Sequence, residues 1–217
     1  MAEYADRVDA GAALALAVIA VWAPEHPRAE PPLVLGLPRG GVPIAALVAA
    51  ALHADLDVLP VRKVSVPGQP ELAVGAVAEG GTAVVDERIR IRSGLSDEAL
   101  AHRIAAAATE LGGLGRRWRS GRDPIPLAGR DVVIVDDGLA TGSTARAAVR
   151  AALTARARSV TVAVPVGPVD SIRALEREGA TVICPVVPSR FHAVGLHYRD
   201  FSQTSDDEVV LLLDRQP

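Results

Sequence analysis

The sequence predicts an α/β protein with a doubly wound, five-stranded parallel sheet in the order 2-1-3-4-5, flanking helices, a flexible flap and a small hood. Short apolar runs alternate with helical stretches along the chain, which is typical of a parallel sheet covered by helices on both faces. The run Val132–Val135 is apolar at every position, as expected of a strand buried on both sides. With 217 residues, the chain fits one elaborated domain over 1–217.

The expected elements follow one another in a regular order. Strands are expected at 33–37, 57–64, 82–86, 131–135, 159–166 and 181–184. Helices are expected at 2–22, 44–52, from Ser96 onward, 145–153 and 168–178, with a Pro-rich connector at 25–32. The Gly- and Pro-rich segment 64–95, with strand-like alternation at 72–78, is the predicted flap, and 185–217 is the predicted hood.

Composition limits the classes of function. A net charge of −3 with 49% hydrophobic residues describes an ordinary globular protein, so we expect no broad binding of nucleic acid. One cysteine, Cys184, excludes an internal disulfide and suits a reducing cytoplasm. The absence of an 18-residue uncharged apolar run argues against a membrane span. A homodimer is a possible assembly.

The most informative segment is a strand, a turn and a helix over 132–153. Asp136 and Asp137 follow the strand, and the turn 138–144 precedes the helix. Backbone amides at a helix N-terminus bind phosphate, and glycine lets the backbone approach the anion closely. The turn adds hydroxyl donors from Thr141, Ser143 and Thr144. Because carboxylates repel phosphate, the acidic pair should face the hydroxyl groups or the cation of the same ligand, as in a sugar phosphate.

This segment resembles the 5-phosphoribosyl-1-diphosphate (PRPP) motif of type I phosphoribosyltransferases, in which an apolar strand precedes two acidic residues and a Thr-Gly-x-Thr loop. The resemblance implies that Asp136 and Asp137 hold the ribose hydroxyls and that the loop cradles the 5′-phosphate. The implied loop residues are Gly138, Leu139, Ala140, Thr141, Gly142, Ser143 and Thr144. It also implies Mg²⁺ that arrives with PRPP, without a dedicated protein cage. A Walker loop is excluded because no Gly-Lys-Ser/Thr is present.

A second turn, Arg39-Gly40-Gly41, follows the first predicted strand. In a 2-1-3-4-5 sheet this turn and the acidic turn meet at the topological switch point, where ligands bind. Its amides and guanidinium suit a diphosphate, and the resemblance implies the same role. The alternative is a plain strand-to-helix turn with an exposed arginine.

Lys63 is the single lysine among 23 basic residues. We expect Arg62 and Lys63 to end the second strand and to contact the diphosphate, as the resemblance to adenine and orotate enzymes implies. A chance surface lysine is the alternative. The following segment lies where the family carries its mobile catalytic loop, which would close over the substrate. Within it, Glu71 and Glu79 are interpreted as solvated, and contact with a base is the alternative.

The C-terminal segment carries Phe191 and Tyr198, and its pattern resembles purine salvage enzymes. Either ring would supply a platform for a base, or both would pack within the hood. His192 and His197 have no partners at zinc-ligand spacing. Ala140 stands where enzymes acting on 6-oxopurines carry an aspartate, and no acceptor base is identified.

The predicted function is therefore PRPP-dependent transfer of a phosphoribosyl group to a nitrogenous acceptor, expected to be a nucleobase, with release of diphosphate. The predicted catalytic residues are Asp136, Asp137, Lys63 and Arg39. The alternative is a PRPP-sensing regulator that binds nucleic acid without transferase activity. It is motivated by a basic cluster with an interleaved tryptophan, formed by Arg116, Arg117, Trp118, Arg119 and Arg122. A solvated helix end that complements the helix dipole is a simpler interpretation of the cluster.

Overall fold

The computed structural model describes residues 2–25 and 30–214. Its core is one parallel sheet in the order β2 (Asp55–Val58), β1 (Leu33–Gly36), β6 (Asp131–Val135), β7 (Ser159–Ala163) and β8 (Thr181–Ile183). With these five strands counted along the chain, the order is the predicted 2-1-3-4-5, which is confirmed. The predicted connector 25–32 lies partly outside the described residues.

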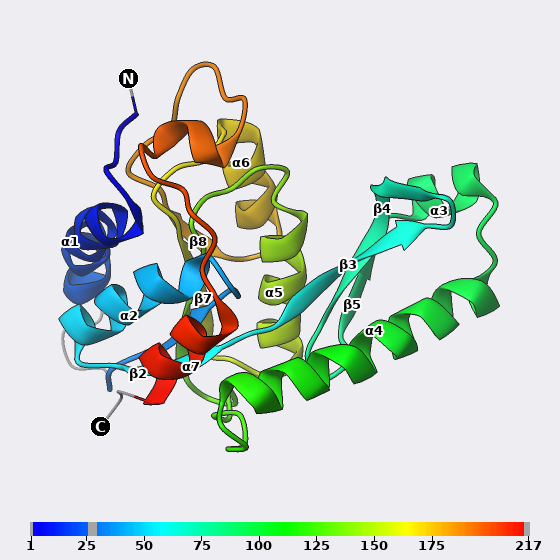
Figure 1. Ribbon diagram of the computed structural model, residues 1–217, viewed down its shortest axis with the longest axis horizontal. Coiled ribbons are helices and arrows are strands. Elements are labelled where there is room, and N and C mark those ends of the chain that lie inside the picture. Colours follow the sequence, from blue (N-terminus) through cyan, green and yellow to red (C-terminus); the bar gives the residue numbers. More distant parts are fainter. Residues whose placement is uncertain (1, 26–29, 215–217) are drawn as a thin grey trace.

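Helices cover both faces of this sheet (Figure 1). On one side lie α1 (Arg7–Glu25) and α2 (Gly41–Leu52), and on the other α5 (Ser143–Thr154) and α6 (Val169–Arg177). The central strand β6 is buried on both of its faces. Val133 and Val135 join the cluster under α1 and α2, and Val132 and Ile134 join the cluster under α5. Since side chains alternate between the faces of a strand, all four must be apolar, and each burial contributes about 1.5–3 kcal/mol.

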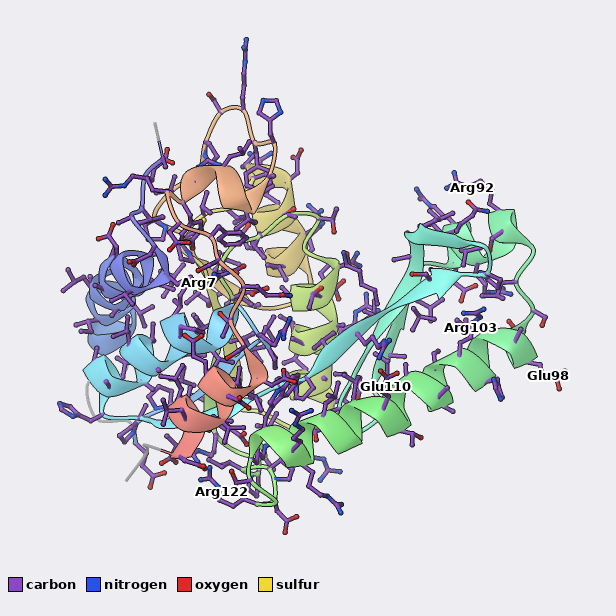
Figure 2. All side chains as sticks on the ribbon, in the orientation of Figure 1. Arg7, Arg92, Glu98, Arg103, Glu110 and Arg122 are labelled. Carbon is purple, nitrogen blue, oxygen red and sulfur yellow. The ribbon has the colours of Figure 1, made fainter. Side chains whose placement is uncertain are left out.

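An arm extends from the core on the side of α5 (Figure 1). It consists of the antiparallel strands β3 (Val61–Val66), β4 (Gln69–Ala78) and β5 (Ala83–Val85), with α3 (Glu87–Ser93) and the long α4 (Asp97–Trp118). Ser96 caps α4 as predicted, because its hydroxyl accepts from the amide of Ala99 at 3.2 Å. The arm has a small apolar core of its own. Charged side chains, Glu98, Arg103 and Glu110 among them, follow the length of α4 (Figure 2).

The predicted second strand, 57–64, is two strands in the structure. β2 ends at Val58, and β3 starts at Val61 and pairs antiparallel with β4. Pro60 lies between them, and because proline has no backbone N–H it cannot continue a ladder of hydrogen bonds. The expectation that Arg62 and Lys63 end the second core strand is therefore wrong. Both residues lie on β3 of the arm.

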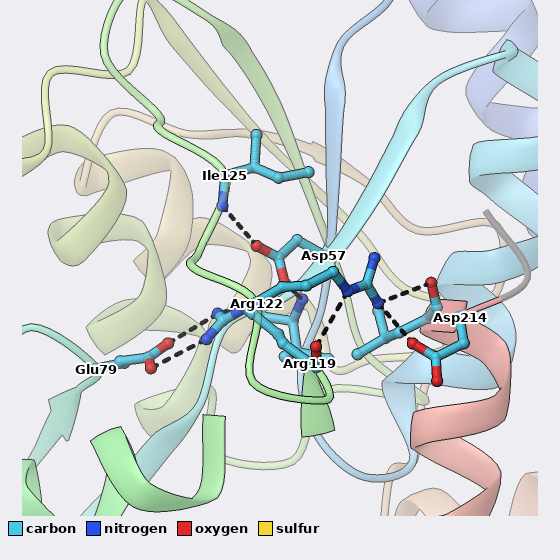
Figure 3. A network of polar contacts seen from close by, with 8 residues as sticks. Asp57, Glu79, Arg119, Arg122, Ile125 and Asp214 are labelled. Atoms are coloured by element: carbon cyan, nitrogen blue, oxygen red, sulfur yellow. Dashed lines mark hydrogen bonds and ion pairs between the residues drawn. The ribbon is translucent and has the colours of Figure 1, made fainter. Parts of the chain in front are cut away.

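Arg119 ties the arm to the core at the end of α4 (Figure 3). Its side chain is buried, with 4% of the residue exposed. It donates to Asp57 at 2.6 Å, to the Val58 carbonyl at 2.8 Å and to both carboxylate oxygens of Glu79 at 3.0 and 2.8 Å. A β-carbon at Gly115 would lie 2.3 Å from Oε1 of Glu79, so glycine there leaves room for the carboxylate that Arg119 holds. The interpretation of Glu79 as solvated is therefore wrong.

The C-terminal segment forms a hood beside the sheet from a short 3-10 helix, η1 (Val194–His197), and α7 (Asp206–Asp214). The N-terminal segment lies against it, because Tyr4 pairs with Tyr198 in a parallel bridge. None of the helices in the described ranges is both long and apolar enough to cross a bilayer.

Candidate functional site

The two predicted turns meet at the carboxyl edge of the core sheet. β1 and β6 are neighbours, with Gly36 opposite Val135. A β-carbon at Gly40 would lie 2.0 Å from Oδ2 of Asp137, and one at Gly41 would lie 2.5 Å from the Val135 carbonyl oxygen. Only glycine lets the first turn approach the acidic turn this closely. The peptide bond before Arg39 is cis.

The acidic pair is held from three directions. Arg7, at the start of α1, donates to Oδ2 of Asp137 from Nε at 3.1 Å and from Nη2 at 2.7 Å. The hydroxyl of Tyr198 donates to the Asp137 carbonyl at 2.6 Å. The amide of Asp137 donates to Oδ1 of Asp136 at 2.9 Å. The pair is thus oriented before any ligand binds.

Burial raises the pKa of both Asp136 and Asp137 above the ordinary range. The negative charge of Asp137 raises the pKa of Asp136 further, whereas Arg7 opposes the increase at Asp137. Two carboxylates confined together destabilise each other's charge, so the site favours a ligand that brings hydroxyl donors or a cation.

The loop after the acidic pair presents the start of α5. Gly142, with φ of 72°, precedes the helix, and no side chain caps it. Free amides at a helix N-terminus favour an anion. Thr141 and Ser143 lie beside them with their hydroxyl oxygens 2.7 Å apart. The loop is anchored from behind, because Ser171 donates to the Ala140 carbonyl at 2.7 Å and Leu139 is buried.

Lys63 lies near this loop, but on β3 of the arm and not at the end of the second core strand as predicted. Lys63, Thr141, Ser143 and Arg146 line one cavity of about 660 Å³ between the arm and α5. Arg62 points elsewhere and pairs with Glu110 of α4. Both residues belong to the arm, but only Lys63 lines the cavity that contains the loop.

Arg39 lies near the hood. One of its guanidinium nitrogens is 3.6 Å from Oδ1 of Asp206 at the start of α7. Its backbone belongs to the turn that packs against the acidic pair, since the Arg39 carbonyl accepts from the amide of Val42 at 3.2 Å.

The aromatic residues of the hood pack among themselves. Tyr198 is 5% exposed, and its ring centroid is 5.6 Å from that of Tyr4 and 4.9 Å from that of Phe201. Phe191 stacks on His197, with ring centroids 5.6 Å apart. Of the two interpretations of Tyr198, packing within the hood is the one that agrees with the structure, because its ring is buried and its hydroxyl donates to the Asp137 carbonyl.

Sequence reasoning missed Arg7. Its guanidinium lies 4.1 Å over the ring of Phe201 while it binds Asp137. The two partners are 130 positions apart, and the N-terminal stretch gave only a helical signal. A lone arginine at the start of an apolar helix was the one available hint.

Three arginines of the cluster at the end of α4 contact carboxylates of the protein, whereas Arg116 is exposed. Arg119 is buried in the network with the core. Arg122 pairs with Asp214 at 2.8 Å, as Figure 3 shows, and Arg117 lies 3.6 Å from Asp206. The feature that motivated a nucleic-acid-binding regulator is thus engaged by the protein's own carboxylates.

Open α/β sheets bind ligands at the topological switch point, and in this chain that point carries a glycine turn, an acidic pair and the uncapped start of a helix. A family model described as "Phosphoribosyl transferase domain" matches residues 6–186. The chain belongs to the phosphoribosyltransferase family, and the resemblance seen in the motif is confirmed.

Two curated Mycobacterium tuberculosis proteins, named "Putative phosphoribosyl transferase Rv0571c" and "Putative phosphoribosyl transferase MT0597", are 46% identical to this chain over 212 residues. The match covers 98% of this chain and 46% of each relative, so the chain spans about half their length. The crystal structure of TT1426 from Thermus thermophilus is 40% identical, with a TM-score of 0.82 over 99% of both chains. A hypoxanthine phosphoribosyltransferase from Staphylococcus aureus shares the fold, at 13% identity and a TM-score of 0.50, covering 93% of this chain and 85% of that one.

Proposed function

We propose that this chain binds PRPP and transfers its phosphoribosyl group to a nitrogenous acceptor, with release of diphosphate. The observation that carries the proposal is the contact between the two turns, in which Gly40 and Gly41 pack on Asp137 and Asp136 beside the free start of α5. A ligand that reaches all three features would suit them if it carried anionic groups for the helix start and the glycine turn, and hydroxyl groups for the carboxylates between them. PRPP has this chemistry.

Each feature has a proposed role. The amides of the loop and the hydroxyls of Thr141 and Ser143 bind the 5′-phosphate. Asp136 and Asp137 accept hydrogen bonds from the ribose hydroxyls and offset positive charge that develops on the sugar. Arg39 and the amides of its turn bind the diphosphate, and Lys63 approaches from the arm.

The carboxylates also fit Mg²⁺, because hard oxygen ligands are what this ion prefers, and it usually reaches a site with substrate phosphates and bound water. Within the part of the chain that the structure describes, no cluster of three or more His, Cys, Asp and Glu side chains could hold a metal. When bound, Mg²⁺ would supply neutralisation of the diphosphate charge.

The reaction follows from these roles. The C1–oxygen bond of the ribose lengthens, diphosphate departs with the electron pair, and the acceptor nitrogen forms the new bond to C1. In this proposal the acidic pair stabilises the sugar as it becomes cationic, and Arg39 and Lys63 stabilise the negative charge that grows on the diphosphate. The arm bounds the cavity on one side and would limit the access of water to the cationic sugar.

Titration calorimetry with PRPP and Mg²⁺ tests the binding step. We expect saturable binding by the wild type, its loss in the double variant Asp136→Asn/Asp137→Asn, and no change in the control Asp123→Asn, whose carboxylate is exposed. Absence of binding at millimolar PRPP would sink the proposal.

Turnover tests the transferase against a sensor that binds PRPP without reacting. With an acceptor present, Lys63→Ala should lower kcat about 100-fold, or about 3 kcal/mol, while PRPP affinity falls less. Lys63→Arg should restore activity only in part, since a guanidinium does not replace a compact point charge. Unchanged turnover in Lys63→Ala would show that the lysine has no part in the reaction.

A further inference from the structure

The arm contains a second cavity that the proposed function does not use. Its volume is about 830 Å³, and residues of β3 form one wall and residues of α4 the other. Its lining includes no residue of the acidic pair, of the first turn or of the loop before α5 (138–144). A cavity of this size is typical of a site for a small molecule.

Two cations enter this arm cavity from opposite walls. Lys63 belongs to β3 and Arg103 to α4, and within the described residues neither has an ion-pair partner. Arg103 points from α4 toward the strands of the arm (Figure 2). A ligand that contacts both walls would therefore meet positive charge on each side.

The two carboxylates at the arm cavity do not cancel these charges. Glu110 is already paired with Arg62 of β3. Glu98 lies in the first turn of α4, where the helix dipole favours negative charge. Its side chain points away from the strands (Figure 2). The interior of the cavity thus keeps a positive excess from Lys63 and Arg103.

Lys63 connects the arm cavity to the candidate site. Among the described residues it is the one that lines both the arm cavity and the cavity of about 660 Å³ that contains Thr141 and Ser143. It lies on β3, which is an edge strand of the arm's sheet. No further strand flanks that edge, so the flexible lysine side chain can turn toward either cavity. Ligands in the two cavities would compete for one ammonium group.

We infer that the arm cavity binds a small molecule with two or more phosphate groups, and that this ligand slows the transferase by drawing Lys63 away from the loop before α5. The guanidinium of Arg103 suits phosphate oxygens through paired hydrogen bonds, and Lys63 suits them as a point charge. The small side chains of Ala99, Ala106 and Ala107 leave room for the organic part of the ligand. The regulation rests on the proposed function, whereas the binding site does not.

NMR titration with inorganic triphosphate, without PRPP, tests the binding site. We expect saturable changes of the amide signals of α4 between His102 and Ala107. Citrate, a polyanion without phosphate, should bind at least tenfold more weakly at the same signals. No saturable change on α4 at millimolar triphosphate, or equal binding of citrate, overturns the inference.

Two exposed arginines of the arm give a matched pair of variants. Arg103 lines the arm cavity, whereas Arg92 of α3 lines neither cavity and lies at the far part of the arm (Figure 2). Arg103→Ala should weaken the binding of triphosphate to α4 at least fivefold, and Arg103→Lys should recover part of it. Arg92→Ala should leave it unchanged. An equal effect of both alanine variants would mean that only the general charge of the arm matters, and it overturns the site.

The competition for Lys63 can be followed directly. Because Lys63 is the only lysine of the chain, isotope-labelled lysine gives a single side-chain signal. Triphosphate should shift this signal in the wild type, and the shift should shrink at least fivefold in Arg103→Ala. The shift caused by PRPP with Mg²⁺ should be the same in both proteins. A triphosphate shift that does not depend on Arg103 would show that the arm cavity does not hold Lys63.

Turnover separates regulation from the proposed function. With an acceptor present and free Mg²⁺ held constant, Arg103→Ala should have the kcat of the wild type and need at least fivefold more triphosphate for the same inhibition. Equal inhibition of both proteins overturns the regulation. If the wild type does not bind PRPP, the proposed function is wrong, while changes on α4 that depend on Arg103 still establish the phosphate site.

Discussion

Arg7 affects both the position and the pKa of Asp137. It binds Oδ2 of Asp137 with two nitrogens and stacks over Phe201. Burial raises the pKa of Asp137, and Arg7 opposes that increase. The arginine is a positioning residue: it opposes the increase in the pKa of Asp137 and holds the carboxylate through two hydrogen bonds beside the first turn.

Arg7→Gln should therefore make PRPP binding more sensitive to acid. Without the guanidinium the pKa of Asp137 rises further, so a smaller fraction of the carboxylate is ionised at a given pH. We expect calorimetry to show a greater loss of affinity at pH 6 than at pH 8. A loss of the same size at both pH values would mean that Arg7 acts through packing and not through charge.

At the scale of elements, Glu178 joins the segment after α6 to α5. It accepts from Arg150 at 2.6 and 2.8 Å and from Arg146 at 3.0 and 2.8 Å. Arg150, and then Arg146, lower the pKa of Glu178 to about 2. Because the folded-state pKa lies below the unfolded one, the charge stabilises the fold above the ordinary glutamate range, and this stability is lost as pH falls toward 2.

Glu178→Gln should lower the free energy of unfolding at pH 7 by about 1–2 kcal/mol, with allowance for the partial exposure of both arginines. The difference from wild type should shrink as pH falls below 4.5 and vanish near 2. Urea titrations across this range measure it, with the exposed Glu176→Gln as control. A difference that does not change with pH would assign the effect to something other than this charge.

The elements also show where sequence reasoning succeeds. The uniformly apolar run of β6 and the serine before α4 predicted their elements because strand burial and helix capping are local properties. Pro60 is also a local signal, because it separates β2 from β3, whereas the apolar pattern alone predicts one strand over 57–64. The acidic pair and the glycine turn were placed correctly because sheet order brings the ends of β1 and β6 together.

Other parts of the site depend on contacts between distant segments. Arg119 meets Asp57 from 62 positions away and Glu79 from 40, and Arg7 meets Asp137 from 130. No periodicity or spacing encodes which carboxylate an arginine reaches, so the cluster at the end of α4 was interpreted as a solvated or nucleic-acid-binding surface. The pairing follows only from the folded arrangement.

At the scale of the whole molecule, Arg119 joins the arm to the core through buried hydrogen bonds (Figure 3). Arg119→Met should remove the charge and leave Asp57 buried without its cation, since Asp57 is 4% exposed. Breaking a buried ion pair by removing one partner costs about 3–5 kcal/mol. Hydrogen exchange should also become faster in β3, β4 and β5 than in the core sheet.

Arg122→Met is the matched variant, because Arg122 pairs with Asp214 at the exposed surface of the same region. It should change the free energy of unfolding by less than about 1 kcal/mol. Similar protection of the arm in both variants would show that apolar packing alone fixes the arm to the core.

The close fit of Gly40 and Gly41 against the acidic turn has a consequence for the thermodynamics of ligand capture. The first turn and the acidic turn are already in contact, so a ligand that binds both does not have to bring two separate loops together. The loss of chain entropy on binding is correspondingly small. What a ligand must still overcome is the loss of its own translational and rotational freedom and the desolvation of its polar groups.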